Sequence, residues 1–440
     1  MRLAVIGTGH VGLVTCVTFA HMGHDVAGYD SDAAKIESLR SCRSPFFEPG
    51  VQELLEEGVG AGRLTFTTDP AEAIPGAEVV FICVGTPPRA SGEASLVAVE
   101  HSARTVAHHA TGPIVVAEKS TVPAGTHDRV LRAIRHERPD LADDIEVVSN
   151  PEFLREGKAV PDTLEPERIL VGAVSERARD VMRRVYEPLT SKGIPLIETN
   201  IATAELAKHA CNAFLSLKIS YVNAIARMCE KAGADVTQVA QVMGTDSRIG
   251  PQFLNAGIGY GGFCFPKDID AFERLAHSLG YAFPLLREVA RINEEAIEAA
   301  VSKVRDVLWN LEDKRIALFG LSFKPETDDV RFSPAIQLGR LLAAEGAEVV
   351  AYDPQAMEEA RKEWPEVKLA EGPFEAAADA HCVVIATEWD EFRNLDLDKL
   401  KEVMKYPVIV DGRNVYDPDE VARRGFTYCP VGRAVEGHVP

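Results

Sequence analysis

The sequence contains no uninterrupted run of about 18 apolar residues, the length that a helix needs to cross a bilayer. Its start, Met-Arg-Leu-Ala-Val-Ile-Gly, also lacks the charged stretch, apolar stretch and small-residue cleavage site of a signal peptide. We therefore expect a cytoplasmic protein with no membrane partner.

Cysteine is scarce and scattered. The chain has 8 cysteines among 440 residues, and no two of them form a Cys-x-x-Cys pair. This spacing favours reduced thiols and gives no indication of a disulfide framework or a metal site. Most of the cysteines are expected to be small core residues.

Basic residues are fewer than acidic ones: the chain has 47 Lys and Arg and 67 Asp and Glu, which gives a net charge of −20. Nucleic-acid phosphates are bound by clustered Lys and Arg, so this balance argues against a nucleic-acid partner. Apolar residues make up 46% and charged residues 26%, as in ordinary globular proteins, which excludes disorder and fibrous repeats. A chain of this length is expected to form two or three domains.

The beginning of the chain reads as strand, glycine turn, helix and strand. A short apolar run precedes Gly7, Gly9 and Gly12, an apolar helix follows, and the next strand ends in Asp30. Such alternation predicts a parallel sheet with helices on both faces. Strands are predicted at 3–6, 25–30, 78–84, 114–118 and 145–149.

The last third of the chain repeats this pattern without the glycine motif. Strands are predicted there at 315–320, 348–353, 381–387 and 407–411. Between the repeats, residues 203–233 contain neither Pro nor internal Gly and predict one long helix. A second helical stretch is predicted at 268–309, with an interruption near Pro284. The predicted fold class is α/β, with two Rossmann-like doubly wound domains joined by a long helical connector that also forms a dimer surface.

The glycine motif indicates a dinucleotide. Its glycines permit a tight turn and let the backbone approach a pyrophosphate, which the helix N-terminus binds. Asp30 lies 18 residues past Gly12, where a carboxylate accepts hydrogen bonds from the adenosine ribose. Because a carboxylate repels a 2′-phosphate, the motif predicts NAD rather than NADP.

Cys264 differs from the other cysteines in its surroundings, Gly-Tyr-Gly-Gly-Phe-Cys-Phe-Pro-Lys-Asp. Exposed backbone amides and nearby cations lower a thiol pKa and activate it as a nucleophile. From the residues alone two interpretations stay open, a catalytic nucleophile and a loop cysteine that only packs.

Four residues share one stripe of the long predicted helix. From Lys208, the offsets of 4, 11 and 15 residues to Asn212, Ile219 and Asn223 fall within about 60° of one another. Polar side chains on one stripe of an apolar helix favour a face turned toward a site, and the alternative is a solvated face.

Acids and cations are also predicted at the carboxyl ends of strands, where open α/β folds bind ligands. Glu152 and Glu156 follow one such strand. Two interpretations stay open: one of the two acids is a general base, or both are surface residues. Lys324, Arg331 and Arg413 lie in loops after strands of the second repeat, where cations suit phosphate.

Six motifs follow one another along nearly the whole chain. They are the glycine motif at 7–12, Lys-Ser-Thr-Val-Pro at 119–123, the run at 150–156, Glu-Leu-Ala-Lys at 205–208 with Asn212, the loop at 248–268 and the loop at 324–331. Together they resemble the UDP-glucose/GDP-mannose dehydrogenase family, and an ordered series is more specific than any one motif.

The resemblance implies a four-electron oxidation, in which the primary alcohol at carbon 6 of a nucleotide sugar becomes a carboxylate while two NAD are reduced in turn. Cys264 would attack the intermediate aldehyde, and a thioester would then be hydrolysed. Lys208 and Asn212 match residues that stabilise the oxyanion. The other catalytic matches, for proton transfer, water placement and hydrolysis, are Asp268, Thr121, Glu156 and Glu152.

The resemblance also implies binding residues. For NAD they are Gly7, Gly9, Val11, Gly12, Asp30, Lys35, Thr86, Thr121, Glu156 and Arg331. For the nucleotide sugar they are Phe153, Leu154, Lys208, Asn212, Asn223, Arg248, Phe253, Leu254, Asn255, Ala256, Gly257, Gly261, Lys267, Lys324 and Arg413. The implied assembly is a homodimer or a higher homo-oligomer.

The same resemblance divides the chain into three parts. Residues 1–199 would bind NAD, residues 200–310 would form the helical dimerisation segment with the cysteine loop, and residues 311–440 would bind the UDP-sugar. Residues 248–257 look like the UDP-glucose branch of the family, and the alternative substrates are GDP-mannose or another nucleotide sugar used by the same family. Phe263 departs from the family pattern, in which a smaller residue is common beside the nucleophile.

Two other functions compete. A two-electron dehydrogenase of the 3-hydroxyacid type would explain neither Cys264 nor the second α/β domain. A catalytically silent nucleotide-sugar sensor would have no reason to keep the whole set of catalytic residues.

Overall fold

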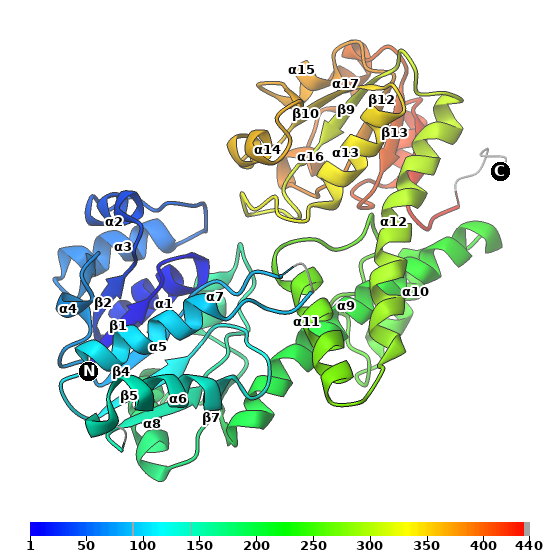
Figure 1. Ribbon diagram of the computed structural model, residues 1–440. Coiled ribbons are helices and arrows are strands. Elements are labelled where there is room, and N and C mark those ends of the chain that lie inside the picture. The colour runs from blue at the N-terminus through cyan, green and yellow to red at the C-terminus, as the bar shows by residue number, and fades with distance from the viewer. Residues whose placement is uncertain (90–91, 142, 435–440) are drawn as a thin grey trace. The chain divides into compact units, whose positions relative to one another are not determined.

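The computed structural model describes residues 1–89, 92–141 and 143–434. The chain forms two compact units. The first comprises Met1–Cys211 with Asp270–Gly280, and the second comprises Asn212–Ile269 with the chain from Tyr281 onward. Each unit is built around its own sheet, so the predicted α/β class with two Rossmann-like sheets is confirmed (Figure 1).

The sheet of the first unit has eight strands in the order β3-β2-β1-β4-β5-β6-β7-β8. The paired strands are parallel except β6 and β7, which pair antiparallel. The strands are β1 (Arg2–Ile6), β2 (Asp25–Tyr29), β3 (Leu64–Thr67), β4 (Val79–Ile82), β5 (Ile114–Glu118), β6 (Ile145–Ser149), β7 (Ile169–Gly172) and β8 (Leu196–Thr199). The helices are α1 (His10–His21), α2 (Ala33–Arg40), α3 (Val51–Gly60), α4 (Pro70–Ala73), α5 (Val97–His109), α6 (Thr126–Glu137), α7 (Ala159–Leu164) and α8 (Glu176–Thr190), with a 3-10 turn at Pro139–Leu141.

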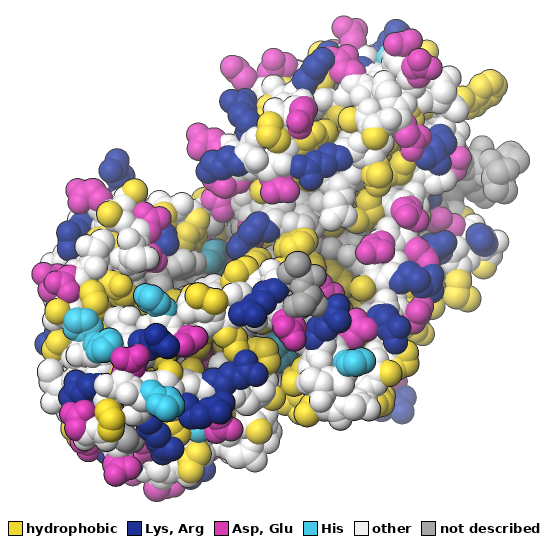
Figure 2. Space-filling view, in the orientation of Figure 1, with side chains coloured by type: hydrophobic (Ala, Val, Ile, Leu, Met, Phe, Trp, Pro, Cys, Tyr) yellow, Lys and Arg dark blue, Asp and Glu magenta, His cyan; other side chains and the backbone are white. Residues whose placement is uncertain are grey.

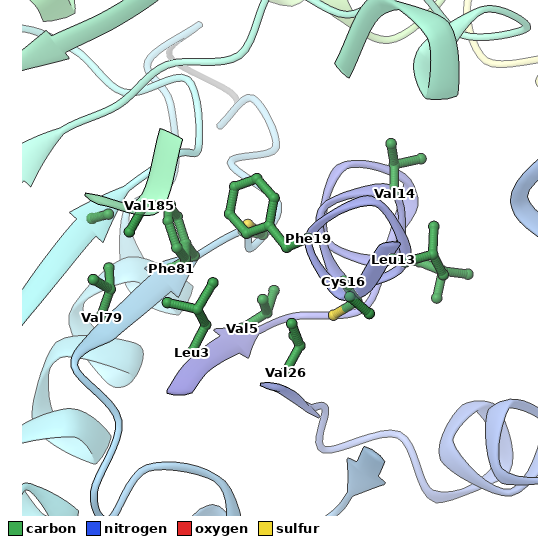
Figure 3. Packing of buried hydrophobic residues seen from close by; sticks show 14 of the residues in the cluster. Leu3, Val5, Leu13, Val14, Cys16, Phe19, Val26, Val79, Phe81 and Val185 are labelled. Atoms are coloured by element: carbon green, nitrogen blue, oxygen red, sulfur yellow. The ribbon is translucent and has the colours of Figure 1, made fainter. Parts of the chain in front are cut away.

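The core of this unit lies where α1 packs on the middle of the sheet. Every residue of β4 and β5 is buried, as expected for parallel strands covered by helices on both faces. Phe19 of α1 lies 5.1 Å from Phe81 and 5.7 Å from Tyr186 between ring centroids. Figure 3 shows Phe19 beside Phe81, with Leu3 and Val5 of β1 next to them.

The sheet of the second unit has six strands in the order β11-β10-β9-β12-β13-β14, and its neighbouring strands pair in parallel. The strands are β9 (Arg315–Phe319), β10 (Glu348–Tyr352), β11 (Lys368–Leu369), β12 (Cys382–Ile385), β13 (Val408–Asp411) and β14 (Thr427–Pro430). The helices that accompany them are α13 (Pro334–Ala344), α14 (Met357–Glu363), α15 (Pro373–Ala377), α16 (Asp390–Arg393), α17 (Leu397–Val403) and α18 (Pro418–Arg423).

Both sheets contain the same strand, turn and strand. Gly7 follows β1 with φ +88°, and Gly320 follows β9 with φ +94°, a backbone conformation that favours glycine. Asp30 follows β2 and Asp353 follows β10, and each carboxylate accepts a backbone N–H from the turn of its own unit. The duplication predicted from the sequence is therefore present in the backbone.

The two aspartates differ in what else they bind. Asp353 also accepts from Ser322 N and Oγ, at 3.0 and 3.1 Å, and from Trp389 Nε1 at 3.2 Å. It is 1% exposed, whereas Asp30 is partly exposed. In the second copy, side chains of the protein itself therefore occupy the carboxylate that corresponds to Asp30.

The helix α9 (Ile201–Ala232) passes without interruption from the first unit into the second. It ends at Gly233, which has φ +70° and is the stop that the sequence predicts. Three further helices are α10 (Val236–Thr245), α11 (Cys264–Ser278) and α12 (Pro284–Leu308). The second predicted helical stretch is interrupted before Pro284, as expected, and forms α11 and α12, but α11 begins at Cys264 rather than at 268. In the described ranges, no helix has the length and apolar character needed to span a bilayer.

Replacing Leu13 by Ala should lower the free energy of unfolding of the first unit by about 2–5 kcal/mol, because the side chain is fully buried in α1 and its loss leaves a cavity. Leu279→Ala is the matched control, since Leu279 belongs to the same unit and is 72% exposed. We expect a change below about 0.5 kcal/mol for the control. Urea unfolding followed by near-UV circular dichroism measures both variants, and equal effects would contradict the prediction.

Candidate active site

The glycine turn between β1 and α1 leaves no room for a side chain at Gly7 or Gly12. A Cβ on Gly12 would lie 1.7 Å from the carbonyl oxygen of Gly7, and a Cβ on Gly7 would lie 2.8 Å from the carbonyl oxygen of Cys83. The α1 N-terminus follows at once, with Val11 in its first turn, and its cap residue Gly9 makes no side-chain cap bond. Its backbone amides are therefore available to an anion, and the turn fits the pyrophosphate of a dinucleotide.

Asp30 lies at the end of β2, beside this turn. Burial opposes its ionisation, but hydrogen bonds from Lys35 Nζ at 2.9 Å and from the amides of Thr8 and Asp32 outweigh burial and lower its pKa. The carboxylate is therefore ionised at neutral pH, as an acceptor for ribose hydroxyls has to be. Lys35, the other predicted cofactor residue here, contacts this carboxylate directly.

Thr86 and Thr121 meet at the carboxyl ends of β4 and β5, where Thr86 Oγ1 donates to the carbonyl oxygen of Thr121 at 3.0 Å. In the same segment, burial raises the pKa of Glu118 to about 8, although Ser120 donates its backbone N–H to the carboxyl. Glu118 is therefore mostly protonated at neutral pH. No signal in the sequence marks this residue.

Lys208 and Glu152 form a buried ion pair in the first unit. Lys208 Nζ lies 3.0 Å from Glu152 Oε1, and the two side chains are 5% and 9% exposed. The same Nζ lies 5.2 Å from the centroid of the Phe153 ring. The guanidinium carbon of Arg168 lies 4.1 Å from the same ring centroid. Glu152 also accepts from the backbone N–H of Leu154 at 2.7 Å. The structure thus brings four predicted residues together and adds Arg168, which the sequence does not mark.

A buried carboxylate fixes the segment next to Glu156. Glu48 accepts hydrogen bonds from the amides of Gly157 at 2.6 Å and Ala159 at 2.8 Å, and it pairs with His10 Nε2 at 2.8 Å. Since His10 is the first residue of α1, Glu48 connects the glycine turn with the backbone that carries Glu156. These partners lie up to 111 residues away in sequence, so no local pattern could reveal them.

Cys264 is the first residue of α11, and it is exposed. The glycines before it are required by close contacts in the second unit. A Cβ on Gly261 would lie 2.4 Å from the carbonyl oxygen of Phe332, and a Cβ on Gly262 would lie 2.8 Å from the Phe323 ring. The cysteine loop therefore packs tightly against the loop that follows β9.

Asp268 lies one turn further along α11 and is 1% exposed. It accepts from Asn212 Nδ2 at 2.6 Å, and the ammonium group of Lys267 contacts its other oxygen. The structure thus joins three predicted residues in one buried cluster. Within it, the Lys267 ammonium contacts a protein carboxylate.

The predicted nucleotide-sugar loop at 253–257 is held by two side chains. Asn223 Oδ1 accepts from the backbone N–H of Gly257 at 2.8 Å, and Arg413 Nη1 donates to the carbonyl oxygen of Gly259 at 3.2 Å. Leu254 and Ala256 are buried, and Phe253 has φ +63°, which is unusual for an aromatic residue. Like Lys208 and Asn212, Asn223 is buried, so a solvated face of α9 is excluded at these positions.

The remaining predicted cations have partners of their own. Arg331 pairs with Asp329 at 2.6 Å, and its guanidinium carbon lies 4.5 Å from the centroid of the Phe263 ring. Lys324 Nζ lies 5.6 Å from the Phe323 ring centroid. Arg248 is highly exposed and pairs with Asp246. Across the part of the chain that the structure describes, no group of three or more His, Cys, Asp or Glu side chains is arranged to hold a metal ion.

Iodoacetamide should label Cys264 before any other cysteine. It is exposed at a helix N-terminus, which stabilises a thiolate, whereas burial raises the pKa of the Cys83 thiol to about 12. Cys42 and Cys211, which are half-buried, are the internal controls. Peptide mass spectrometry over a time course measures the order, and earlier labelling of either control would contradict the prediction.

Three consecutive parts of the chain match domains of known proteins. Residues 1–190 match the NAD binding domain of the UDP-glucose/GDP-mannose dehydrogenase family, residues 202–295 match its central domain, and residues 317–418 match its UDP binding domain.

Individual relatives match over their whole length. The chain is 48% identical over 437 residues to the UDP-glucose 6-dehydrogenase of Rhizobium meliloti (strain 1021), covering 98% of this chain and 100% of the relative. It is 42% identical to UDP-glucose 6-dehydrogenase TuaD of Bacillus subtilis (strain 168), covering 100% and 95%. The solved structure of a UDP-glucose dehydrogenase from the archaeon Pyrobaculum islandicum matches with a TM-score of 0.91 and 39% identity, over 98% of each chain. The turn that fits a dinucleotide thus stands in a chain that belongs, along its whole length, to the UDP-glucose/GDP-mannose dehydrogenase family of NAD-dependent oxidoreductases.

Proposed function

We propose that this chain oxidises UDP-glucose to UDP-glucuronate through a covalent intermediate on Cys264. The observation that carries the proposal is the exposed thiol at the start of α11, one helical turn before the buried Asp268. A helix N-terminus favours the thiolate, and an exposed thiolate can reach a substrate carbon. The names of the relatives from Rhizobium meliloti and Bacillus subtilis support the same substrate.

The proposed reaction has four steps at carbon 6 of the sugar. Carbon 6 first loses a hydride and its hydroxyl loses a proton, which leaves an aldehyde. The Cys264 sulfur then bonds to carbon 6, and the carbonyl electron pair moves to oxygen. Loss of a second hydride gives a thioester, and water bonds to carbon 6 as the carbon–sulfur bond breaks and the thiolate leaves. When bound, NAD accepts the hydride in each oxidation.

The overall balance follows from these steps. Each UDP-glucose consumes two NAD and one water, and it yields UDP-glucuronate, two NADH and three protons. The first and third steps each release one NADH, so the stoichiometry distinguishes this reaction from a simple alcohol oxidation.

The polar residues of α9 and α11 supply the charge that these steps need. Lys208 and Asn212 lie one turn apart on α9 and would stabilise the oxyanion. Asn212 has two amide N–H groups, and Asp268 accepts from one of them, which orients the side chain. Asp268 and Thr121 would place water and move its proton, and Glu156 would assist thioester hydrolysis. The Glu152 carboxylate would keep Lys208 charged and oriented.

The binding roles follow the three-part division, which we also propose. Residues 1–199 would bind NAD, with the glycine turn on the pyrophosphate and Asp30 on the ribose. Residues 311–440 would hold the UDP-sugar with Lys324 and Arg413. On the face drawn in Figure 2, acidic and basic side chains are interspersed. Because the net charge is −20, an anionic substrate would depend on these local cations. The eight cysteines are free thiols, which suits the cytoplasm.

We further propose a homodimer formed through α9. Phe214, Tyr221 and Met228 recur every seven residues, so they lie on one face of the helix. They are 60%, 50% and 65% exposed, although each is large and apolar. An exposed apolar stripe of this kind marks an interaction surface, and a second copy of the same helix offers a matching one.

Purified protein with excess NAD and limiting UDP-glucose should form two NADH per sugar oxidised, because the thioester route contains two hydride transfers. Absorbance at the NADH band measures the ratio. GDP-mannose in a parallel reaction should give no turnover. One NADH per sugar would contradict the covalent route, and turnover of GDP-mannose alone would keep the route but change the substrate.

The variant Cys264→Ser tests the nucleophile in the same assay. It should bind NAD and UDP-glucose, as measured by calorimetry, but release no UDP-glucuronate. Cys42→Ser is the matched control, since Cys42 is half-buried in the first unit, and it should give normal stoichiometry.

Phe214→Glu should convert the dimer into a monomer, because it places a charge in the middle of an apolar contact. Light scattering coupled to size-exclusion chromatography measures the mass. Leu279→Glu, at an exposed apolar position outside the stripe, is the control and should stay dimeric. A monomeric unmodified protein would refute the interface.

A further inference from the structure

The segment that carries Thr121 is held in place by α9. His209 is 1% exposed, and its Nε2 donates to the carbonyl oxygen of Val122 at 3.0 Å. Its ring stacks on Phe272, with the centroids 5.8 Å apart and the planes inclined by 20°. The hydrogen bond therefore comes from a side chain whose orientation is fixed by packing.

A second bond from the same helix holds the other end of the segment. Glu205, one turn before His209 and 3% exposed, accepts from the backbone N–H groups of Gly125 at 2.7 Å and His127 at 3.1 Å. Gly125 is the cap residue of the 12-residue helix α6 and offers no side chain of its own. Glu205 therefore replaces the missing cap and binds the helix N-terminus through its carboxylate.

The segment is also held from its other side. Thr86 donates to the carbonyl oxygen of Thr121 at 3.0 Å, and Ser120 Oγ donates to Ile82 O at 3.1 Å. Thr121 thus sits in a short irregular stretch that side chains of both the sheet edge and α9 restrain. Of these two supports, the sheet edge and α9, it is α9 that also carries Lys208, which lies between Glu205 and His209 in the sequence.

We propose that Glu205 and His209 are positioning residues, which fix Thr121 with respect to Lys208 so that water can attack the thioester. This inference rests on the proposed function and adds two residues to it. In the step concerned, the water oxygen bonds to carbon 6, the carbon–sulfur bond breaks, Cys264 leaves as thiolate and the proton of water passes to a base. Misplacement of Thr121 slows this step and leaves the earlier oxidations less affected.

The test compares His209→Leu with His209→Gln. Leucine keeps an apolar side chain of similar reach and removes the donor, whereas glutamine restores an N–H donor. His24→Leu is a matched control, because His24 is also buried in the first unit and its Nε2 donates to a backbone carbonyl, that of Val185, at 2.9 Å. The control removes the same kind of bond away from Thr121.

We expect His209→Leu to lower kcat by about ten- to a hundredfold, the effect of a small displacement of a reacting group. KM for UDP-glucose should fall in about the same proportion, so that kcat/KM changes by less than about twofold, because hydrolysis follows the first release of NADH. Hydroxylamine should trap more thioester than in the unmodified enzyme, and His209→Gln should restore most of the rate. His24→Leu should lower the melting temperature without raising the trapped fraction.

Hydrogen exchange of the peptide spanning 118–127 gives a readout independent of the reaction. His209→Leu and Glu205→Ala should each speed exchange there, while His24→Leu should not. Unchanged exchange, or an unchanged trapped fraction in a variant that turns over normally, would overturn the inference. If the unmodified enzyme forms one NADH and no trappable thioester, the proposed function fails, and the inference as stated fails with it. Faster exchange in that case would still show that α9 holds the segment.

Discussion

Buried carboxylates that accept backbone N–H groups hold this protein's loops in place. Glu48 binds the backbone at 157 and 159, and Glu205 binds it at 125 and 127. In the second unit, Asp411 accepts from Arg413, Val415 and Tyr416. In each case a buried carboxyl group accepts hydrogen bonds from amides that would otherwise lack partners, although burial raises the pKa of Glu205 and of Asp411. The loops with the candidate catalytic residues are therefore ordered mainly by polar contacts, while the sheets below them are ordered by apolar packing.

The sequence predicts the strands and their apolar packing well, but it predicts the polar contacts that order the loops poorly. The strands β5 and β6 end where the alternation of apolar segments places them, because local composition determines burial in a parallel sheet. The helix α11 begins at Cys264, although Gly and Pro around it predicted a loop, since contacts with the 323–332 loop fix the glycines. Glu48 and Arg168 have no local signature, and their partners come from distant segments. Local patterns indicated the glycine turn with Asp30, Cys264 and the stripe on α9, whereas the remaining site residues were predicted only from the order of the motifs along the chain.

A strongly acidic chain that binds an anionic substrate has to concentrate its cations. Arg331 is already paired with Asp329, Lys208 with Glu152, and Arg413 with backbone carbonyls. Such pairing keeps the cations oriented and prevents repulsion among them, but a phosphate has to compete with the existing partners. In the proposed function, specificity for a particular diphosphate would then come from geometry more than from net attraction, because the net charge of −20 opposes an anionic ligand.

The hydrogen bonds of Asp353 bear on how many coenzyme molecules one chain can bind. Its carboxylate is saturated by Leu321, Ser322 and Trp389. Of the two strand-turn-strand copies in the described ranges, only the one with Asp30 keeps an acceptor at the surface. In the proposed reaction, two NAD molecules would therefore bind at the same site one after the other, and the half-oxidised sugar would have to persist while the coenzyme is exchanged. A tether to the protein would keep such a reactive aldehyde from diffusing away during that pause.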